Sequence, residues 1–274
     1  MKILALNWLG NNIGDDIQTI AIMRHLPPVD GFINRDHLNS YDGPPALLVT
    51  NGWFLSALDN WPPSEAIKPL FFGFHVQKHA KATIARHVDY LKKHEPIGCR
   101  DRGTMEFIRS LGVEAYLSLC STLTFDAPED RNPDSIYLVE AELSDLTRRF
   151  RKTHGLTVRS VSHRFIDVSA ATRLQYAREL VEVYGRKAAM VVTSRIHCAM
   201  PCVAMGIPTI YVGPKAYRTE ILEEIGLTRR DRWHLFKHPF AKQIDEMPAP
   251  IDHAETKKRI NADLKDRISK ALSS

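Results

Sequence analysis

The sequence lacks the features that stabilise or anchor a protein outside the cytoplasm. It has four cysteines in 274 residues and no C-x-x-C pair, so neither a disulfide framework nor a paired-cysteine metal site is expected. No apolar run is long enough to cross a membrane. The opening segment, Met1-Lys2-Ile3-Leu4-Ala5-Leu6-Asn7, turns polar too soon for a signal peptide. We therefore expect a cytoplasmic protein, with at most peripheral contact at the inner face of an anionic membrane.

Signatures of nucleotide and nucleic-acid binding are also missing. The chain has neither G-x-G-x-x-G nor a P-loop, so a dinucleotide or ATP site is not supported. A net charge of +5 is compatible with anionic substrates but is too small and too evenly spread to indicate nucleic acid. The densest basic run, Arg148-Arg149-Phe150-Arg151-Lys152, is expected to be the solvated end of a helix. The alternative is contact with anionic lipid or a diphosphate-linked acceptor.

Strand-like and helix-like segments alternate along the whole chain, which is typical of parallel α/β domains. The expected strands are Ile3–Asn7, Ala46–Thr50, Pro69–Phe74, Pro96–Cys99, Ala115–Leu119, Ile136–Val139, Thr157–Ser160, Ala188–Thr193 and Thr209–Val212. The expected helices are one ending near His25, then Lys81–Lys93, Arg102–Leu111, Ala170–Tyr184, Tyr217–Ile225 and a charged last helix over about His253–Leu272.

A polar, proline-containing stretch at residues 126–134 is the best candidate for a linker. Because the alternation restarts after it, we expect two parallel-sheet, Rossmann-like domains facing a cleft. The first would cover residues 1–127. The second would cover residues 128–274 and include the last helix.

The most informative segment joins the predicted strand Ala188–Thr193 to a helix through Ser194-Arg195-Ile196-His197. Ligands of open parallel sheets bind at the carboxyl ends of the strands. A helix N-terminus favours an anion there, and an arginine can grip a carboxylate or phosphate with its planar fork. His197 can both give and take a proton near neutral pH. The alternative is that Arg195 caps a sheet edge and His197 is a core histidine.

Two cysteines follow on the same helix. Cys198 and Cys202 lie one turn apart beside His197. We expect them to be small packing residues. A zinc site is the alternative, but no second ligand pair has the usual spacing, so no metal is expected.

Three further turns carry polar groups at the ends of predicted strands. Asn12-Ile13-Gly14-Asp15-Asp16 opens the first helix, where glycine lets a ligand approach the backbone. Asp15 either contacts a sugar hydroxyl or, like Asp16, complements the helix dipole. Asn51-Gly52 forms a second turn, followed by Trp53, which either stacks on a sugar or belongs to the core. Arg100-Asp101 forms the third: an anion-binding pair, or a surface arginine with an N-cap aspartate.

Together these four turns resemble the polysaccharide pyruvyltransferase family. The motifs that carry the resemblance are Asn-x-Gly-Asp after the first strand, a glycine turn after an inner strand, Gly-x-Arg-Asp-x-x-Thr with a following Leu-Gly-Val, and Val-Val-Thr-Ser-Arg-x-His before Ala-x-Gly-Ile-Pro. Their order and spacing match over most of the chain, from Met1 to about Val212.

The resemblance implies a GT-B-like arrangement of two Rossmann-like domains. It also implies transfer of the pyruvyl group of phosphoenolpyruvate onto two hydroxyls of one sugar, with release of phosphate. The acceptor would be a bacterial-type exopolysaccharide, capsule or cell-wall glycan precursor, for instance one linked to a lipid diphosphate. His197 would be the general acid, and Asp15 or Asp101 the general base. Arg195 and Arg100 would bind the donor's anionic groups, and no cofactor is implied. The remaining substrate contacts would come from Ser194, Asn12, Gly14, Asn51 and Gly52.

Two alternatives stay open. The first is a GT-B glycosyltransferase that uses a nucleotide sugar, with Glu220 or Glu223-Glu224 holding the ribose. The second is a non-catalytic subunit that binds or assembles glycans. The sequence names neither the acceptor sugar nor the oligomeric state.

Overall fold

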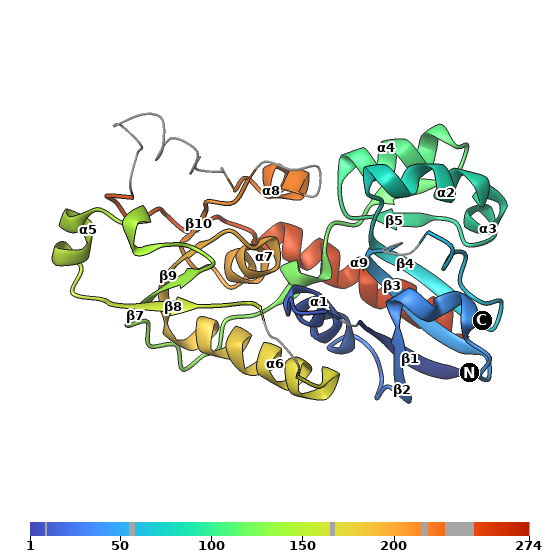
Figure 1. The fold of residues 1–274 in the computed structure, drawn as a ribbon, viewed down its shortest axis with the longest axis horizontal. Helices are drawn as coiled ribbons and strands as arrows, with labels where there is room; N and C mark the ends of the chain where they lie inside the picture. Colours follow the sequence, from blue (N-terminus) through green and yellow to red (C-terminus); the bar gives the residue numbers. More distant parts are fainter. Residues whose placement is uncertain (9, 55–57, 165–167, 215–218, 228–243, 274) are drawn as a thin grey trace. The chain divides into compact units, whose positions relative to one another are not determined.

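The computed structural model describes residues 1–8, 10–54, 58–164, 168–214, 219–227 and 244–273 (Figure 1). Contacts within the chain divide it into two units. Unit 1 contains residues 1–10, 18–122 and 256–274, and unit 2 contains residues 11–17 and 123–255. Helix α1 (Gly14–Met23) contributes its first turn to unit 2 and the rest to unit 1.

Unit 1 is built on a parallel sheet in which the described residues form six strands, in the order β2-β1-β3-β4-β5-β6. These strands are β1 (Lys2–Asn7), β2 (Gly31–Asn34), β3 (Ala46–Trp53), β4 (Ile67–His75), β5 (Ile97–Cys99) and β6 (Ala115–Leu117). The helical segments of this unit are η1 (Arg35–Ser40), η2 (Lys78–Ala80), α2 (Lys81–Arg86), α3 (Val88–Lys93), α4 (Arg102–Ser110) and α9 (Ala254–Ser273), with η3 (Ser121–Thr124) at its boundary.

Unit 2 is built on a second parallel sheet, whose four described strands follow the order β10-β9-β7-β8. Its strands are β7 (Ser135–Val139), β8 (Thr157–Val161), β9 (Ala188–Thr193) and β10 (Thr209–Tyr211). Its helical segments are η4 (Leu143–Asp145), α5 (Arg148–Thr153), α6 (Ala170–Lys187), α7 (Ile196–Ala204) and α8 (Glu220–Glu224).

The strand sequences explain why both sheets are parallel and covered. Every residue of β7 is buried, and in β3 only Trp53 is partly exposed. Continuous apolar runs of this kind are typical of parallel strands with helices on both faces. The prediction of a parallel α/β protein is therefore confirmed.

The last helix differs from the expected domain division. We expected it to belong with residues 128–274, but Thr256–Ser274 cluster with unit 1. Its buried side chains, Ile260, Leu264 and Ile268, repeat every four residues and give α9 one apolar stripe. On the same helix the Arg267 guanidinium lies 3.9 Å from the centre of the Tyr116 ring of unit 1.

Several predicted boundaries also shift. The helix expected over Lys81–Lys93 is two helices, because His87 leaves the helical region at φ −113° and ψ 36°. Strand β6 ends before Leu119, whose φ is 61°. The short strand β2 was not predicted, because Gly31-Phe32-Ile33-Asn34 offers too short a pattern. The start of the predicted helix Tyr217–Ile225, at residues 217–218, lies outside the described residues.

Candidate functional site

The carboxyl edge of the unit 2 sheet gathers the Ser-Arg-x-His segment with residues from two neighbouring strands. Ser194 and Arg195 follow β9, and Glu140 follows β7, the next strand in the sheet. The Ser194 hydroxyl donates to the Glu140 carbonyl at 2.9 Å, and the Arg195 N–H donates to Thr193 Oγ1 at 2.9 Å. These bonds fix the turn that leads into α7, where Arg195 occupies the N-cap position.

Glu140 also lies at this edge of the sheet, although no sequence motif indicated it. Its Oε2 lies 3.7 Å from Nη2 of Arg195, and both side chains remain partly exposed. Its Oε1 accepts hydrogen bonds from Ser162 Oγ at 2.8 Å and from the His163 N–H at 3.2 Å. The residue has φ 51°, a conformation that costs a non-glycine residue about 1–3 kcal/mol. The surrounding bonds therefore hold a strained residue, with its carboxylate beside Arg195.

The negative charge of the Glu140 carboxylate is stabilised by its neighbours. Burial raises the pKa of its carboxyl group, but the Ser162 hydrogen bond, the charge of Arg195 and the His163 N–H together lower that pKa below its ordinary value. Glu140 is therefore anionic at neutral pH. A donor anion that binds Arg195 would share the guanidinium with this carboxylate.

The loop before α1 packs against the same edge. The Ile13 N–H donates to the His163 carbonyl at 3.0 Å, and Asn12 forms a single antiparallel bridge with Arg164. Asn12 Oδ1 accepts from the Gly14 N–H at 3.3 Å. The short segment after β8 thus braces both Glu140 and this loop.

His197 lies directly against the first residue of α1. A Cβ atom placed on Gly14 would come within 3.1 Å of His197 Nδ1, which is closer than side chains normally approach. Only glycine therefore fits here without displacing the imidazole. His197 is the second residue of α7 and is only 6% exposed. The structure thus brings together His197, Asn12 and Gly14.

The two aspartates of α1, Asp15 and Asp16, have different surroundings. Asp16 is buried and its Oδ2 lies 3.2 Å from Nε of Arg173, which is also buried on α6. Asp16 therefore has a structural partner in the core of unit 2, in addition to its place near the positive end of the helix. Asp15 is buried in the same helical turn. It lies one residue after Gly14, next to the His197 contact.

A buried polar cluster lies behind His197. His163 Nε2 and the Tyr184 hydroxyl are 3.0 Å apart, and both side chains are inaccessible to solvent. Cys198 and Cys202 are also fully buried. Burial raises the pKa of Cys198, but hydrogen bonds with Cys202 and His163 lower it overall. The burial of both cysteines agrees with the packing role expected for them.

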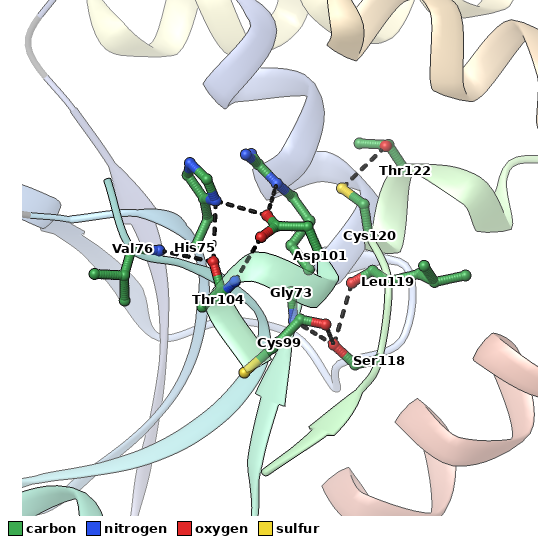
Figure 2. A network of polar contacts seen from close by, with 11 residues as sticks. Gly73, His75, Val76, Cys99, Asp101, Thr104, Ser118, Leu119, Cys120 and Thr122 are labelled. Carbon is green, nitrogen blue, oxygen red and sulfur yellow. Dashed lines mark hydrogen bonds and ion pairs between the residues drawn. The ribbon is translucent and has the colours of Figure 1, made fainter. Parts of the chain in front are cut away.

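Unit 1 carries a second polar network, at the ends of β4 and β5 (Figure 2). Asp101 caps α4 by accepting from the Thr104 N–H at 2.9 Å through Oδ1. Its Oδ2 accepts from His75 Nδ1 at 2.6 Å and lies 3.5 Å from Arg100 Nε. Thr104 Oγ1 lies 3.2 Å from His75 Nδ1 and accepts from the Val76 N–H.

This network changes the role expected of Asp101. Burial raises the pKa of its carboxyl group, but the hydrogen bond and charge of His75, with Arg100 and the Thr104 N–H, hold it well below the ordinary range. Both of its oxygens are engaged, so the N-cap interpretation holds for Oδ1. His75 was missed in the sequence analysis because no motif surrounds it. When the ring is neutral, donation from Nδ1–H to this carboxylate leaves Nε2 as its basic nitrogen.

Asn51 and Gly52 need a correction. We expected a turn after the strand, but both residues lie inside β3, where the register with β4 shifts between Thr50 and Gly52. Gly52 has φ 88°, and a Cβ atom there would lie 3.2 Å from Gln18 Oε1. The feature is a β-bulge that brings the backbone close to α1. Asn51 and Gly52 belong to unit 1, as do Arg100 and Asp101, whereas Ser194, Arg195 and His197 belong to unit 2.

Comparison with known proteins decides the family. The family model described as polysaccharide pyruvyl transferase matches residues 12–215, more than half of the chain. The chain belongs to this polysaccharide pyruvyl transferase family. Every predicted site residue, from Asn12 to His197, lies within the matched range. The family makes the protein a transferase that acts on polysaccharide, and the resemblance seen in the sequence motifs is confirmed.

Solved structures give a weaker likeness. The uncharacterized protein KP1_0663 from Klebsiella pneumoniae has a TM-score of 0.51 at 11% identity, over 81% of this chain and 87% of that one. This match supports the fold alone. A UDP-N-acetylglucosamine 2-epimerase gives a TM-score of 0.48 at 11% identity, over 96% of this chain and 95% of that one. The wall teichoic acid polymerase TagF gives 0.37 at 10% identity, over 99% and 82%. A search of curated proteins finds no match.

No helix in the described part of this pyruvyl transferase family member combines the length and apolar character that a membrane crossing requires. The basic run Arg148–Lys152 lies on α5, where Phe150 is buried and its charged neighbours are exposed. This agrees with a solvated helical segment.

Proposed function

We propose that the protein transfers the pyruvyl group of phosphoenolpyruvate onto two hydroxyls of one sugar in an exopolysaccharide, capsule or cell-wall glycan precursor, and releases phosphate. The observation that carries the proposal is the packing of His197 against Gly14. His197 comes two residues after Arg195, which lies beside the anchored carboxylate of Glu140. Transfer from phosphoenolpyruvate requires a proton donor close to an anion-binding side chain, and this arrangement supports those roles for His197 and Arg195.

The proton balance assigns the remaining roles. The two acceptor hydroxyls lose two protons: one ends on the methylene carbon, which becomes a methyl group, and one leaves with phosphate. His197 gives the proton to carbon, and the carbon–oxygen bond to phosphate breaks as the ketal forms. Arg195 holds one anionic group of the donor and Arg100 the other. Ser194 fixes the turn through Glu140, and Asn12 fixes the start of α1.

Two groups are candidate bases for the hydroxyls. Asp15 is one, at the start of α1 beside the His197 contact. The other is the Asp101–His75 pair, in which Asp101 orients the ring and His75 Nε2 accepts the proton. Asn51 and Gly52 are proposed contacts of the acceptor. Catalysis in the cytoplasm, on a lipid-linked precursor at the inner face of the membrane, would fit this donor.

Deuterium incorporation tests the chemistry. In heavy water, wild-type protein with phosphoenolpyruvate and acceptor should place one deuterium in the ketal methyl group. His197→Ala and His197→Gln should fold, bind phosphoenolpyruvate within about tenfold, and lose most turnover, by about 10²–10⁴-fold. Near-normal turnover in both variants would assign the acid to another residue. Binding of a nucleotide sugar instead of phosphoenolpyruvate would favour the glycosyltransferase alternative.

A further inference from the structure

We propose that Trp8, Arg35 and Trp53 form a stacking surface for the ring of the acceptor sugar; this inference rests on the function proposed above. The three residues follow or end three adjacent strands. Trp8 comes after β1, Arg35 comes directly after β2, and Trp53 is the last residue of β3. Because the sheet order is β2-β1-β3 and the strands are parallel, all three lie at its carboxyl edge. Ligands of such sheets bind at this edge.

The side chains form a cation held between two indole rings. The guanidinium carbon of Arg35 lies 5.0 Å from the centre of the Trp8 ring and 4.7 Å from that of Trp53. Both distances are within the range of about 6 Å in which a cation is attracted to an aromatic face. Arg35 is 5% exposed, whereas both tryptophans are partly exposed. Of these three side chains, the two tryptophans therefore keep the larger exposed fraction.

This arrangement suits a pyranose. A sugar ring presents apolar C–H groups on its face and hydroxyls around its edge, and an indole ring buries the former without competing for the latter. Because one cation contacts both rings, they are held in place before a ligand arrives, which lowers the ordering cost of binding. Arg35 also adds positive charge, which favours an acceptor joined to a phosphate or diphosphate.

One of the three residues lies outside the family match. Trp8 precedes residue 12, where the match begins. A Cβ atom on Gly10 would lie 2.2 Å from the Trp8 ring, so the ring packs closely against Gly10.

A printed array of bacterial glycans and simple pyranosides, probed with the labelled full-length protein, tests the proposal. Wild type should bind a subset of the glycans. Trp8→Ala, Trp53→Ala and Arg35→Gln should each lower that binding by at least about tenfold, equivalent to about 1.4 kcal/mol. Trp61→Phe is the matched control, because Trp61 is 5% exposed within a cluster with Phe54, Phe71 and Phe74.

Calorimetry with phosphoenolpyruvate should give the same affinity for all of these variants. Unchanged glycan binding in Trp8→Ala and Trp53→Ala, or the absence of any glycan binding by wild type, would overturn the proposal. If the alanine variants fail to fold, Trp8→Leu and Trp53→Leu, which keep apolar bulk but have no flat aromatic face, replace them, and binding equal to wild type in both would contradict the proposal. Tryptophan-dependent glycan binding without any turnover of phosphoenolpyruvate would uphold the stacking surface and reject the proposed function.

Discussion

At the scale of single residues, Arg100 and Arg195 each lie at a strand end beside a carboxylate that is itself anchored. Arg195 lies beside Glu140, which Ser162 and His163 hold. Arg100 lies beside Asp101, which His75 and Thr104 hold. A carboxylate fixed in this way orients the guanidinium, and it also competes with an incoming anion. The two effects make opposite contributions to substrate affinity, so substitution can separate them.

Glu140→Gln should separate orientation from competition. The amide oxygen can still accept from Ser162 and His163, so the melting temperature should stay close to that of wild type. Without the negative charge, KM for phosphoenolpyruvate should stay equal or fall, because Arg195 no longer shares its charge. The kcat should drop by about tenfold, equivalent to about 1.4 kcal/mol of lost orientation. A raised KM with unchanged kcat would contradict this role.

The pH dependence of the same pair follows from the lowered pKa of Glu140. The carboxylate is present throughout the neutral range and disappears only as the pH falls through its folded-state pKa. Wild type should therefore converge on Glu140→Gln in both kcat and KM at acidic pH. The variant's own profile should lack that acidic transition. Steady-state kinetics of both proteins across the acidic range measure the difference.

Asp101→Asn should cost stability in a pH-dependent way. The folded-state pKa of Asp101 lies below that of the unfolded chain, so its contribution is fully present above the unfolded value of about 3.9 and is lost as pH falls towards the folded value. Breaking a buried charge pair costs about 3–5 kcal/mol. Urea unfolding should show that gap at pH 7 and a narrower one at pH 3. Asp42→Asn, at an exposed loop position, should show neither effect.

At the scale of elements, the sequence predicted the positions of most strands well, but some strand ends and the side-chain networks poorly. Apolar runs such as Ala188–Thr193 were assigned correctly, and the observed β9 has those bounds. The Ser-Arg-x-His motif supplied Ser194, Arg195 and His197 of the candidate site in unit 2. Glu140 and His75 were not predicted, because their partners follow strands that are distant in sequence but adjacent in the sheet. The β-bulge at Gly52 was not predicted, because the sequence does not distinguish a glycine in a strand from a glycine in a turn.

The first turn of α1 provides a test of the contact between elements. In Gly14→Ala the new methyl group would meet His197 Nδ1 at 3.1 Å, so the imidazole must move. Alanine is the better helix former by about 1 kcal/mol, so stability should not fall much. We expect kcat to drop by at least about tenfold while the melting temperature changes little. Gly31→Ala is the control, because its Cβ would meet Leu4 at an ordinary 3.7 Å. Equal kcat in the two variants would show that the position of His197 does not affect catalysis.

At the scale of the whole molecule, the two units repeat one plan. Each has a parallel sheet whose carboxyl edge carries an arginine, an anchored carboxylate and a buried histidine, although the strand orders differ. Residue types that handle anions and protons are thus present in both units. A donor with a carboxylate and a phosphate offers one anionic group for each arginine, which is the basis for assigning both to phosphoenolpyruvate.

Arginine-to-lysine substitutions test that assignment. Lysine keeps the charge but is a point donor that cannot form two parallel hydrogen bonds with a carboxylate or phosphate. Arg195→Lys and Arg100→Lys should each weaken phosphoenolpyruvate binding by about tenfold or more, the cost of one charge-assisted hydrogen bond of about 1.5–3 kcal/mol. Isothermal titration calorimetry of the full-length protein, without added metal, measures this. Arg148→Lys, at an exposed position on α5, is the control and should match wild type. If only one of the two site variants loses affinity, the donor is held by that unit alone, and the other arginine has a structural role in its own sheet. If neither does, the donor assignment fails, and the same titration with nucleotide sugars becomes the deciding measurement.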